Sequence, residues 1–532
     1  MNAAIPDISA AAEAVASASE VTAAAARQLA RSEGGVDANQ VVAYDLAHAS
    51  AALECARAAV EYGGRGEVEG RLAAGFVADA VHDAAGRVLG REAAWGVEAG
   101  ALDDALELVR RWRDPAYLAT LAGEPGPRHL DSDLVLVQDT FRRFAEDEVR
   151  PVAGHVHRHN EDVPESIIEG LAEIGTFGVS VPEEYDGFAA AGEGEYLAMV
   201  VATEELSRGS LGVAGSLITR PEILSRALVT GGTEEQKRAW LPRIASGELM
   251  CAVAVTEPDY GSDVANLRVA ARPDADGWRI NGLKTWCTFG GRADVLMVLA
   301  RTDPDRSKVH RGLSVFIVPK ERVDGHSFEL TQPEGGRMEG RAIDTIGYRG
   351  MHSFEVAFEN WFVPGENLIG GENGAGRGFY LQMKGFENGR LQTAARAIGV
   401  MQAAYEAAHD YAAERRVFGR PIGDYQLTRV KLGRMATIIQ ATRQFAYQVA
   451  RLMANGGGAI QAPMLKAYAC QAAEWVTREA MQIHGGMGYA EEFPVSRYFV
   501  DARVLSIFEG ADEILALKVI SRRLIEQARA AS

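Results

Sequence analysis

The sequence predicts an α+β protein in which a β-domain lies between two helical domains, with an additional helical domain at the N-terminus. Three observations support this fold class. Apolar residues recur at helical spacing before about residue 250 and again after residue 366. From about 251 to 365 the pattern changes to short apolar runs and strict alternation, which is typical of strands. A segment rich in Pro and Gly near residue 124 separates the first helical domain from the rest.

The N-terminal domain, residues 1–124, is Ala-rich and helical. One helical face carries apolar residues at steps of four and three: Val42, Leu46, Ala49, Leu53, Ala56 and Val60. The domain ends at Gly123-Glu124-Pro125-Gly126-Pro127, where the prolines lack amide donors and restrict the residues before them. We therefore predict a linker and a domain boundary there.

A loose internal similarity connects the two ends of the chain. Residues 40–88, two helical runs around the Gly63-Gly64 break, resemble residues 426–482, two helical runs around Gly456-Gly457-Gly458. This similarity favours a degenerate copy of the C-terminal helices. Two unrelated Ala-rich helical hairpins would look equally similar, so both interpretations stay open.

The remaining domains follow from the period of the apolar residues. Residues 130–250 are helical, with Leu134, Val137, Phe141 and Phe144 at helical spacing and a turn-rich break at 181–185. Residues 251–365 form the β-domain, with predicted strands at 295–299, 313–318 and 353–359. Residues 366–532 are helical again, with breaks at 455–458 and 484–489.

Composition and charge narrow the function. The 55 basic and 73 acidic residues give a net charge of −18, which argues against nucleic acid or an anionic membrane as the partner. The chain lacks an apolar run of about 20 residues that could span a bilayer, and the N-terminus lacks the features of a secretory signal. The four cysteines show neither disulfide nor metal spacing. We therefore expect a cytoplasmic protein that acts on small molecules without a metal.

Five short motifs follow one another along the chain. They are Val255-Thr256-Glu257-Pro258 with Gly261-Ser262-Asp263, Trp286-Cys287-Thr288, Arg415-Arg416-Val417-Phe418-Gly419, Gln482-Ile483-His484-Gly485-Gly486 and Ile507-Phe508-Glu509-Gly510-Ala511-Asp512-Glu513. In this order and at these separations they resemble the acyl-CoA dehydrogenase family, over roughly residues 130–532. The resemblance implies a β-barrel or β-sandwich between a helical domain and a C-terminal four-helix bundle. It also implies an enzyme that dehydrogenates an acyl-CoA substrate with FAD as cofactor.

The resemblance implies that Glu509 is the catalytic base. A C–H next to a thioester is a poor acid, so its removal requires a positioned base and stabilisation of charge on the carbonyl oxygen. Some family members carry the base on another helix, just before an arginine, but here Gly389 precedes Arg390 and glycine cannot accept a proton. Glu387 is a weaker candidate, and the alternative for Glu509 is an ordinary solvated acid.

A first group of implied FAD contacts lies in the β-domain. Thr256 and Ser262 flank a turn whose hydroxyls and amides would reach the flavin and its phosphates, with Val255 beside them. Trp286 is expected to pack against the flavin ring, and Thr288 to donate a hydrogen bond toward the N5 atom.

A second group of implied FAD contacts lies in the C-terminal domain. Arg415 and Phe418 resemble residues that bind the FAD of a neighbouring subunit, with Gln426 nearby and Gln482 and Gly486 on the facing chain. The resemblance therefore implies a homodimer or homotetramer. The alternative is that Arg415 lies at a solvated helix end.

The neighbours of the base carry implied contacts as well. Ala511 and Glu513 occupy cofactor-binding positions, where relatives usually carry Thr and often Gln. The resemblance also implies substrate contacts from four residues: Ser262, Phe386, Arg390 and Gly510.

An arginine in the predicted acyl pocket suggests the chemical nature of the acyl group. Counting from Glu204-Glu205-Leu206, the helix that lines the acyl pocket in relatives should include Ile218 and Arg220. An arginine there could bind a distal carboxylate in a bidentate way, as a dicarboxylyl-CoA would require. Two alternatives stay open: Arg220 is a surface residue before Pro221, or Arg349 binds the carboxylate instead.

The long N-terminal domain indicates a particular branch of the family. In the size and helical character of this domain, the chain resembles the branch that oxidises (2S)-methylsuccinyl-CoA to mesaconyl-CoA in the ethylmalonyl-CoA pathway. Electron-transfer flavoprotein is then the implied electron acceptor. The alternatives are a dehydrogenase for another short or branched acyl-CoA, an oxidase that uses O₂, and a non-enzymatic helical interaction protein that contains flavin.

Overall fold

The computed structural model describes residues 6–123, 125–189, 192–333 and 335–531. Two predictions fall partly on residues outside these ranges: the prediction about a secretory signal includes residues 1–5, and the predicted linker includes Glu124. The chain forms two compact units, which are Met1–Val135 with Thr393–Ser532, and Leu136–Gln392. The first and the last of the predicted domains thus contribute to the same compact unit.

The unit Leu136–Gln392 contains a layer of helices around an apolar core that it shares with a sheet. Its helices are α8 (Ser132–Phe144), α9 (Arg150–His159), α10 (Glu165–Glu173), α11 (Glu193–Gly209), α12 (Thr219–Gly231) and α13 (Glu234–Ala245). Helix α8 starts in the other unit, contains the four apolar residues predicted at helical spacing and buries Phe141 in this core. Helix α13 starts at a capping box, in which Thr233 and Gln236 satisfy each other's backbone amides. The predicted break appears as a 3₁₀ turn at Glu183–Tyr185.

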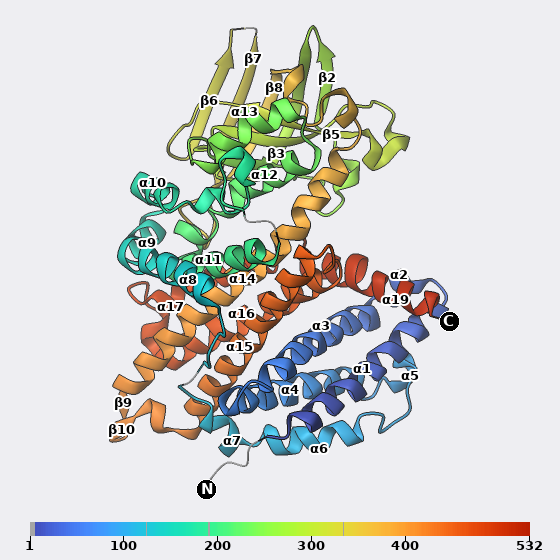
Figure 1. The fold of residues 1–532 in the computed structure, drawn as a ribbon, viewed down its shortest axis with the longest axis vertical. Helices are drawn as coiled ribbons and strands as arrows, with labels where there is room; N and C mark the ends of the chain where they lie inside the picture. The colour runs from blue at the N-terminus through green and yellow to red at the C-terminus, as the bar shows by residue number, and fades with distance from the viewer. Residues whose placement is uncertain (1–5, 124, 190–191, 334, 532) are drawn as a thin grey trace. The chain divides into compact units, whose positions relative to one another are not determined.

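The sheet of this unit is curled and mixed (Figure 1). Among the residues that the structure describes, its eight strands are β1 (Cys251–Ala254), β2 (Ala270–Asp274), β3 (Gly277–Thr288), β4 (Val295–Arg301), β5 (Leu313–Pro319), β6 (Ser327–Gln332), β7 (Gly336–Ile343) and β8 (Ser353–Pro364). The order is β1-β4-β2-β3-β8-β7-β6, with β5 paired to β4. Strand β4 pairs in parallel with β1 and antiparallel with β5.

The predicted strands are present as β4, β5 and β8, and their burial agrees with the apolar pattern. Every residue of β4 is buried, as expected for a short apolar run in a sheet covered on both faces. Strand β8 alternates at its start, where Phe354, Val356 and Phe358 are buried while Glu355 and Glu359 are exposed. The prediction of a β-domain between helical ones is therefore confirmed.

The other unit is made of helices from both ends of the chain. The N-terminal helices are α1 (Ile8–Arg31), α2 (Gly35–Ala38), α3 (Gln40–Gly63), α4 (Glu67–Val88), α5 (Glu92–Trp95), α6 (Asp103–Trp112) and α7 (Pro115–Thr120). The C-terminal elements are α14 (Gly378–Glu414), the hairpin β9 (Arg416–Val417) and β10 (Arg420–Pro421), α15 (Gln426–Ala454), α16 (Gln461–His484), α17 (Pro494–Leu505), α18 (Asp512–Ile514) and α19 (Ser521–Ala530). Helix α14 starts in the other unit and crosses the boundary at Thr393. The predicted glycine breaks separate α3 from α4 and α15 from α16.

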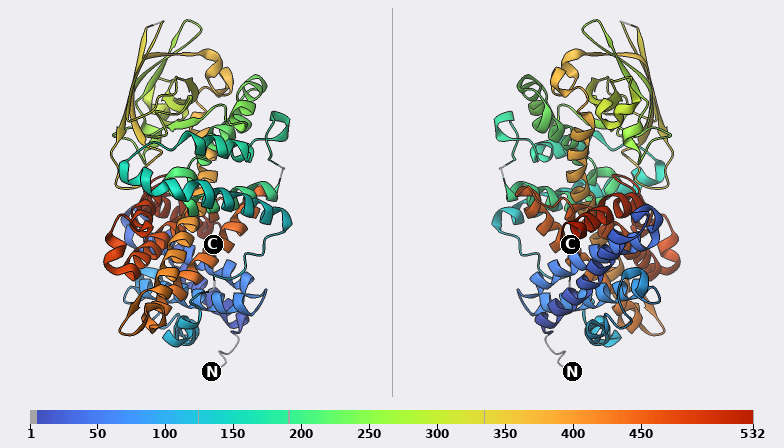
Figure 2. Two further views of the ribbon diagram at one scale, coloured as in Figure 1. Left: turned by 90° about the vertical axis from the view of Figure 1, so that its left-hand side faces the viewer. Right: turned by 90° about the vertical axis from the view of Figure 1, so that its right-hand side faces the viewer.

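Helices α3 and α4 pack against α15 and α16, so segments far apart in sequence lie side by side (Figures 1 and 2). The middle of the predicted apolar face of α3 is buried, where Leu46, Ala49, Leu53 and Ala56 are at most 1% exposed, while Val42 and Val60 at its two ends are partly buried. Alanines on this face let the helix axes approach closely because their side chains are short. The segment after α7 also contacts this core, since Tyr62 donates a hydrogen bond to the carbonyl of Pro127 at 3.0 Å.

Within the described ranges, no helix is both long enough and apolar enough to cross a membrane.

Candidate active site

The loop that carries Glu509 has an unusual backbone. It connects α17 to α18, and Glu509 lies in the left-handed region with φ of 53°, followed by Gly510 with φ of 97°. Glycine adopts this conformation without strain, whereas a residue with a side chain does so at a cost. Such strain persists only where surrounding contacts enforce it, and it is concentrated at functional sites.

The carboxylate of Glu509 has two side-chain partners on α14. The Thr393 hydroxyl donates to Oε2 at 2.7 Å, and the Arg396 guanidinium donates to Oε1 at 2.7 Å. Arg396 is fully buried, and only 7% of the Glu509 side chain is exposed. The guanidinium also lies over the ring of Phe508, 4.8 Å from its centre. Glu509 is therefore not a solvated surface acid.

A buried lysine holds the backbone on both sides of Glu509. The ammonium group of Lys466 on α16 donates to the carbonyl of Phe508 at 2.8 Å and to that of Gly510 at 2.5 Å. These two bonds span the strained residue, so they supply part of the restraint that its conformation requires. Ala511 follows at the N-cap of α18, and Glu513 in its first turn is exposed.

The alternative base position lies on α14. Gly389 is buried there, between Phe386 and Arg390, which are both partly buried. The side chain of Glu387 lies outside the described residues. These positions belong to Leu136–Gln392, whereas Glu509 belongs to the other compact unit.

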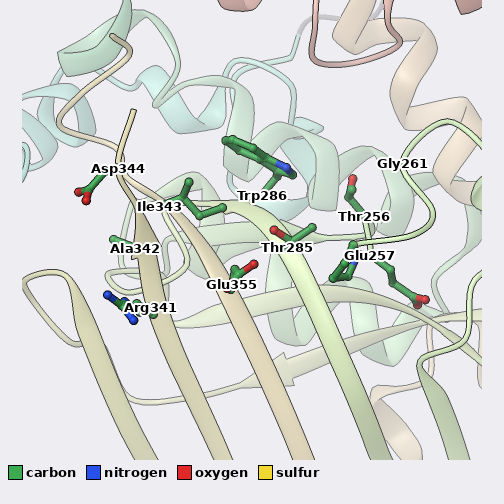
Figure 3. A pocket seen from close by; sticks show the side chains of 11 residues that line it. Thr256, Glu257, Gly261, Thr285, Trp286, Arg341, Ala342, Ile343, Asp344 and Glu355 are labelled. Carbon is green, nitrogen blue, oxygen red and sulfur yellow. The ribbon is translucent and has the colours of Figure 1, made fainter. Parts of the chain in front are cut away.

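A cavity of about 570 Å³ opens on the sheet of the unit Leu136–Gln392 (Figure 3). Ligand pockets usually measure about 300–1,000 Å³. Its walls come from the turn after β1, from β3, and from the ends of β7 and β8: Thr256, Glu257, Pro258, Gly261, Thr285, Trp286, Arg341, Ala342, Ile343, Asp344 and Glu355. Thr256 and Trp286, predicted from separate motifs, therefore line one cavity.

Trp286 is presented to this cavity by an irregularity in β3. The pairing of β3 with β8 shifts between Lys284 and Cys287, and Trp286 has a φ of 57°. A bulge of this kind turns a side chain away from its regular direction. Consequently 52% of Trp286 is exposed, although it lies in the middle of a sheet.

The turn after β1 is held by a buried ion pair. Lys284 is fully buried, and its ammonium group donates to the Val255 carbonyl at 2.8 Å and to Glu257 at 3.0 Å. The carboxylate of Glu257 also accepts the backbone amides of Arg268 and Val269, at 2.7 and 2.8 Å. Burial lowers the pKa of Lys284 to about 8, and the charge of Glu257 partly offsets this effect. The pair fixes Val255 and Thr256 at the cavity edge.

Three predicted flavin contacts lie outside the cavity walls, and one of them is Val255, which is buried beside Thr256. Thr288 is buried, and its hydroxyl shares a hydrogen bond of 3.0 Å with the hydroxyl of Ser353. Ser262 is exposed in the turn after β1. The Thr288 hydroxyl can accept from Ser353 and still donate to a ligand, since a hydroxyl is both donor and acceptor.

The chemistry of the cavity fits a flavin. The half-exposed indole of Trp286 offers an aromatic face for stacking, and the Thr256 hydroxyl offers a hydrogen bond. A Cβ added at Gly261 would meet no atom closer than 3.7 Å, so the turn leaves room beside its backbone for a ligand.

The second predicted group of flavin contacts gathers at one exposed end of the helical unit. The ring of Tyr411 near the end of α14 stacks on His484 at the end of α16, with 4.2 Å between centres, which brings these termini together. The five predicted residues Arg415, Phe418, Gln426, Gln482 and Gly486 are all exposed. Phe418 is 96% exposed at the tip of the β9–β10 hairpin, with φ of 49°. A ring exposed to this extent is accessible to another molecule.

The two candidate arginines differ in their surroundings. Arg220, in the first turn of α12, is 7% exposed, so the alternative of a surface arginine is wrong. Arg349 donates to the carbonyls of Thr345 and His157 at 3.1 and 2.8 Å, and these bonds anchor the backbone around it. Ile218 is buried in the core beside Arg220.

Several residues at these sites could not be found from the sequence. Thr393, Arg396 and Lys466 contact the loop that carries Glu509, and Lys284 holds the turn beside Thr256. Each is far from its partner along the chain and belongs to no motif. The available signal was weak: Thr393 and Arg396 continue the spacing of three from Arg390 along α14, a helix that also carries Asn388 and Gln392.

Three domain families match the chain. They are the acyl-CoA dehydrogenase N-terminal domain over residues 131–248, the middle domain over 252–361 and the C-terminal domain over 376–525. The chain belongs to the acyl-CoA dehydrogenase family. It is thus an oxidoreductase that acts on acyl-CoA, and FAD is its cofactor.

Individual relatives share most of the chain. It is 42% identical to the (2S)-methylsuccinyl-CoA dehydrogenase of Cereibacter sphaeroides, over 81% of this chain and 78% of that one. It is 34% identical to the mitochondrial short-chain specific acyl-CoA dehydrogenase of Sus scrofa, over 74% and 90%. The structure of butyryl-CoA dehydrogenase from Megasphaera elsdenii has a TM-score of 0.68 at 30% identity, over 75% and 99%.

Proposed function

We propose that this acyl-CoA dehydrogenase converts (2S)-methylsuccinyl-CoA to mesaconyl-CoA and passes the electrons to an electron-transfer flavoprotein. The observation that carries this proposal is the similarity to the Cereibacter sphaeroides enzyme. That alignment has the higher identity, and it covers 81% of the chain, compared with 74% for the short-chain enzyme of Sus scrofa. The additional coverage indicates that the similarity is not limited to the part shared by the whole family.

In this proposal Glu509 removes the proton from the carbon next to the thioester. FAD, when bound, accepts the hydride from the β-carbon. The side chains of Thr393 and Arg396 place one hydrogen bond on each oxygen of Glu509, and each oxygen has a second lone pair that can accept the α-proton. The bond from Thr393 comes from a neutral donor and is weaker than the bond from the Arg396 cation. Arg396 then keeps the carboxylate in place during proton transfer.

Arg220 supplies the proposed contact to the distal carboxylate of the substrate. Arg220 is 7% exposed and so does not lie at the surface, and the planar fork of arginine matches a carboxylate. Burial of Arg220 therefore supports this role over a surface role. The backbone bonds of Arg349 make it the weaker candidate.

A screen of flavin bleaching tests the cofactor, the reaction and the substrate together. Purified holoenzyme is mixed without air with methylsuccinyl-, succinyl-, butyryl- and glutaryl-CoA, and the loss of flavin absorbance is followed over time. We expect the fastest bleaching with (2S)-methylsuccinyl-CoA. Faster bleaching by an unbranched monocarboxylyl-CoA would contradict the substrate assignment but not the family.

The base is tested with Glu509→Gln. This variant should keep its FAD and lose flavin reduction by about 10² to 10⁴, the usual effect of removing a general base. Glu492→Gln, at an exposed acid outside the loop, is the matched control and should reduce flavin normally. Near-normal reduction by Glu509→Gln would place the base elsewhere.

The electron acceptor, the assembly and the compartment are part of the same proposal. A dehydrogenase reduces an electron-transfer flavoprotein or a dye and forms little peroxide in air, whereas an oxidase forms peroxide at each turnover. The exposed hairpin with Phe418 supports a homodimer or homotetramer in which it reaches the FAD of a neighbouring subunit. We place the protein in the cytoplasm, where its acyl-CoA substrate is found.

A further inference from the structure

The carboxylate of Asp512 connects the loop that carries Glu509 to the N-terminal helices. Three donors converge on its Oδ2 atom: the Tyr44 hydroxyl at 2.6 Å, the His48 Nε2 at 3.1 Å and the Gln471 side-chain amide at 2.9 Å. Tyr44 and His48 lie one turn apart on α3, and Gln471 lies on α16. The N-terminal domain thus contacts a residue only three positions after Glu509.

This cluster is a buried network. The His48 side chain is 3% exposed and that of Asp512 is 11% exposed. Burial alone would raise the pKa of Asp512, but hydrogen bonding and charge from His48, then hydrogen bonds from Tyr44 and Gln471, lower it below its ordinary value. Burial and Asp512 together raise the pKa of Tyr44 to about 12. At neutral pH the cluster is therefore an ionised carboxylate with a protonated phenol as one of its donors.

The cluster completes the restraint on the strained loop. The amide of Asp512 donates to the Ser506 carbonyl at 3.1 Å, which closes the loop, and Lys466 holds the carbonyls of Phe508 and Gly510. The left-handed conformation of Glu509 requires contacts on both sides of the loop, because the backbone alone disfavours it. Lys466 restrains the middle of the loop, and the donors to Asp512 fix its C-terminal end.

We propose that Tyr44 and His48 are positioning residues for the catalytic base, so that the N-terminal domain is a working part of the active site. This inference rests on the proposed role of Glu509. Releasing Asp512 lets the loop relax and moves the Glu509 carboxylate from the geometry that reaches the substrate α-carbon. An error of about 1 Å in the position of a reacting group can cost roughly 100-fold in rate.

The test compares variants of the full-length holoenzyme. Tyr44→Phe/His48→Ala removes two of the three donors and leaves every residue of the loop in place. The matched control is Asp79→Asn, because Asp79 on α4 pairs with Arg434 on α15 at 2.7 Å and so also joins the N-terminal and C-terminal helices, on elements that do not carry the loop. Flavin reduction at saturating substrate, KM, FAD content and Tm are measured for each variant.

We expect Tyr44→Phe/His48→Ala to slow flavin reduction at saturating substrate by roughly 10- to 100-fold, with KM and FAD content unchanged. Asp79→Asn should lower Tm but not the rate of reduction. His48→Gln, which keeps an N–H donor, should retain most of the rate. The proposal is overturned if the double variant reduces flavin at the normal rate, or if Asp79→Asn loses as much.

Two further comparisons keep the result clear. If the double variant does not fold, Tyr44→Phe alone, which removes only one hydroxyl, should still slow reduction without changing KM, and a normal rate would refute the proposal. Glu509→Gln is measured in parallel. Loss of reduction in Glu509→Gln together with a normal rate in Tyr44→Phe/His48→Ala would reject the positioning role and keep the base assignment.

Discussion

The proposed contact between Arg220 and the distal carboxylate of the substrate leads to a prediction at the scale of one residue. Arg220→Ala should lower kcat/KM for methylsuccinyl-CoA by about 10- to 100-fold, the effect of losing a hydrogen bond to a charged group of about 1.5–3 kcal/mol. Butyryl-CoA, which has no distal carboxylate, should be affected much less. Arg220→Lys keeps the charge and loses the planar fork, so its kcat/KM for methylsuccinyl-CoA should lie between the values of the unchanged enzyme and of Arg220→Ala. Equal losses for both substrates would exclude a contact with the distal carboxylate.

The buried pair of Lys284 and Glu257 leads to a prediction about cofactor retention. Lys284→Met leaves the Glu257 carboxylate buried without its ion-pair partner, which typically costs about 3–5 kcal/mol, and it releases the Val255 carbonyl at the cavity edge. We expect a lower Tm and a lower ratio of FAD to protein after gel filtration. Lys284→Met/Glu257→Gln removes both charges and should recover much of the Tm. Full FAD content in Lys284→Met would show that the pair does not hold the cavity.

At this scale the motifs led to residues that lie together in the structure, and the roles assigned to those residues stay predictions. Thr256 and Trp286 were predicted from separate motifs and line one cavity, and Glu509 is buried and paired. The partners that hold them were not predicted. Arg396 is 113 positions from Glu509, and Tyr44 is 468 positions from Asp512. Such pairs depend on the packing of helices, which the local pattern of one sequence does not encode.

Among the elements, the β9–β10 hairpin leads to a prediction about the assembly of subunits. Its tip exposes Phe418 almost completely, on a backbone that a bulky residue adopts at a cost. Phe418→Ala should weaken FAD retention and shift the mass measured by light scattering toward the monomer, if the ring reaches a neighbouring subunit. Leu89→Ala, at a residue that is 78% exposed in the same compact unit, is the control and should change neither. An unchanged mass and FAD content in Phe418→Ala would leave the ring without a partner.

Elements were predicted best where burial imposes a period. Strand β8 alternates and α3 carries a continuous apolar face, so the core-facing residues were visible in the sequence. The bulge in β3 was not predicted, because Trp286 is an ordinary strand residue by composition. Its departure from the regular direction is set by pairing with β8, and this departure is what presents the ring to the cavity.

For the whole molecule, the sequence predicted the order of helices and strands but not how the parts combine. The linker near residue 124 led us to expect a separate N-terminal domain. The structure instead shows α3 and α4 packed on α15 and α16 within one compact unit. The Ala-rich faces that make these helices look alike in sequence also let them pack closely together. Which surfaces pair is a long-range property that composition does not determine.

Acid should destabilise the whole chain before its carboxylates are protonated. Burial lowers the pKa of His352 in one compact unit and of His484 in the other below the ordinary value of 6.5. Both therefore favour the neutral form when folded, and the unfolded chain binds more protons as the pH falls below about 6.5. This contribution to stability is present above pH 6.5 and is lost as the pH falls toward the lowered pKa values. The pKa of Asp512 is lowered from 3.8, so its contribution to stability is lost only at more acidic pH.

The measurement is Tm as a function of pH from 8 to 5. We expect a plateau above about pH 6.5 and a decline below it. His352→Gln/His484→Gln removes both titrating rings and should flatten the decline, even if its Tm on the plateau is lower. His159→Gln, at an exposed histidine on α9, should leave the shape of the profile as it is. A decline of the same size in His352→Gln/His484→Gln would mean that other groups, and not these two buried imidazoles, make the folded protein sensitive to acid.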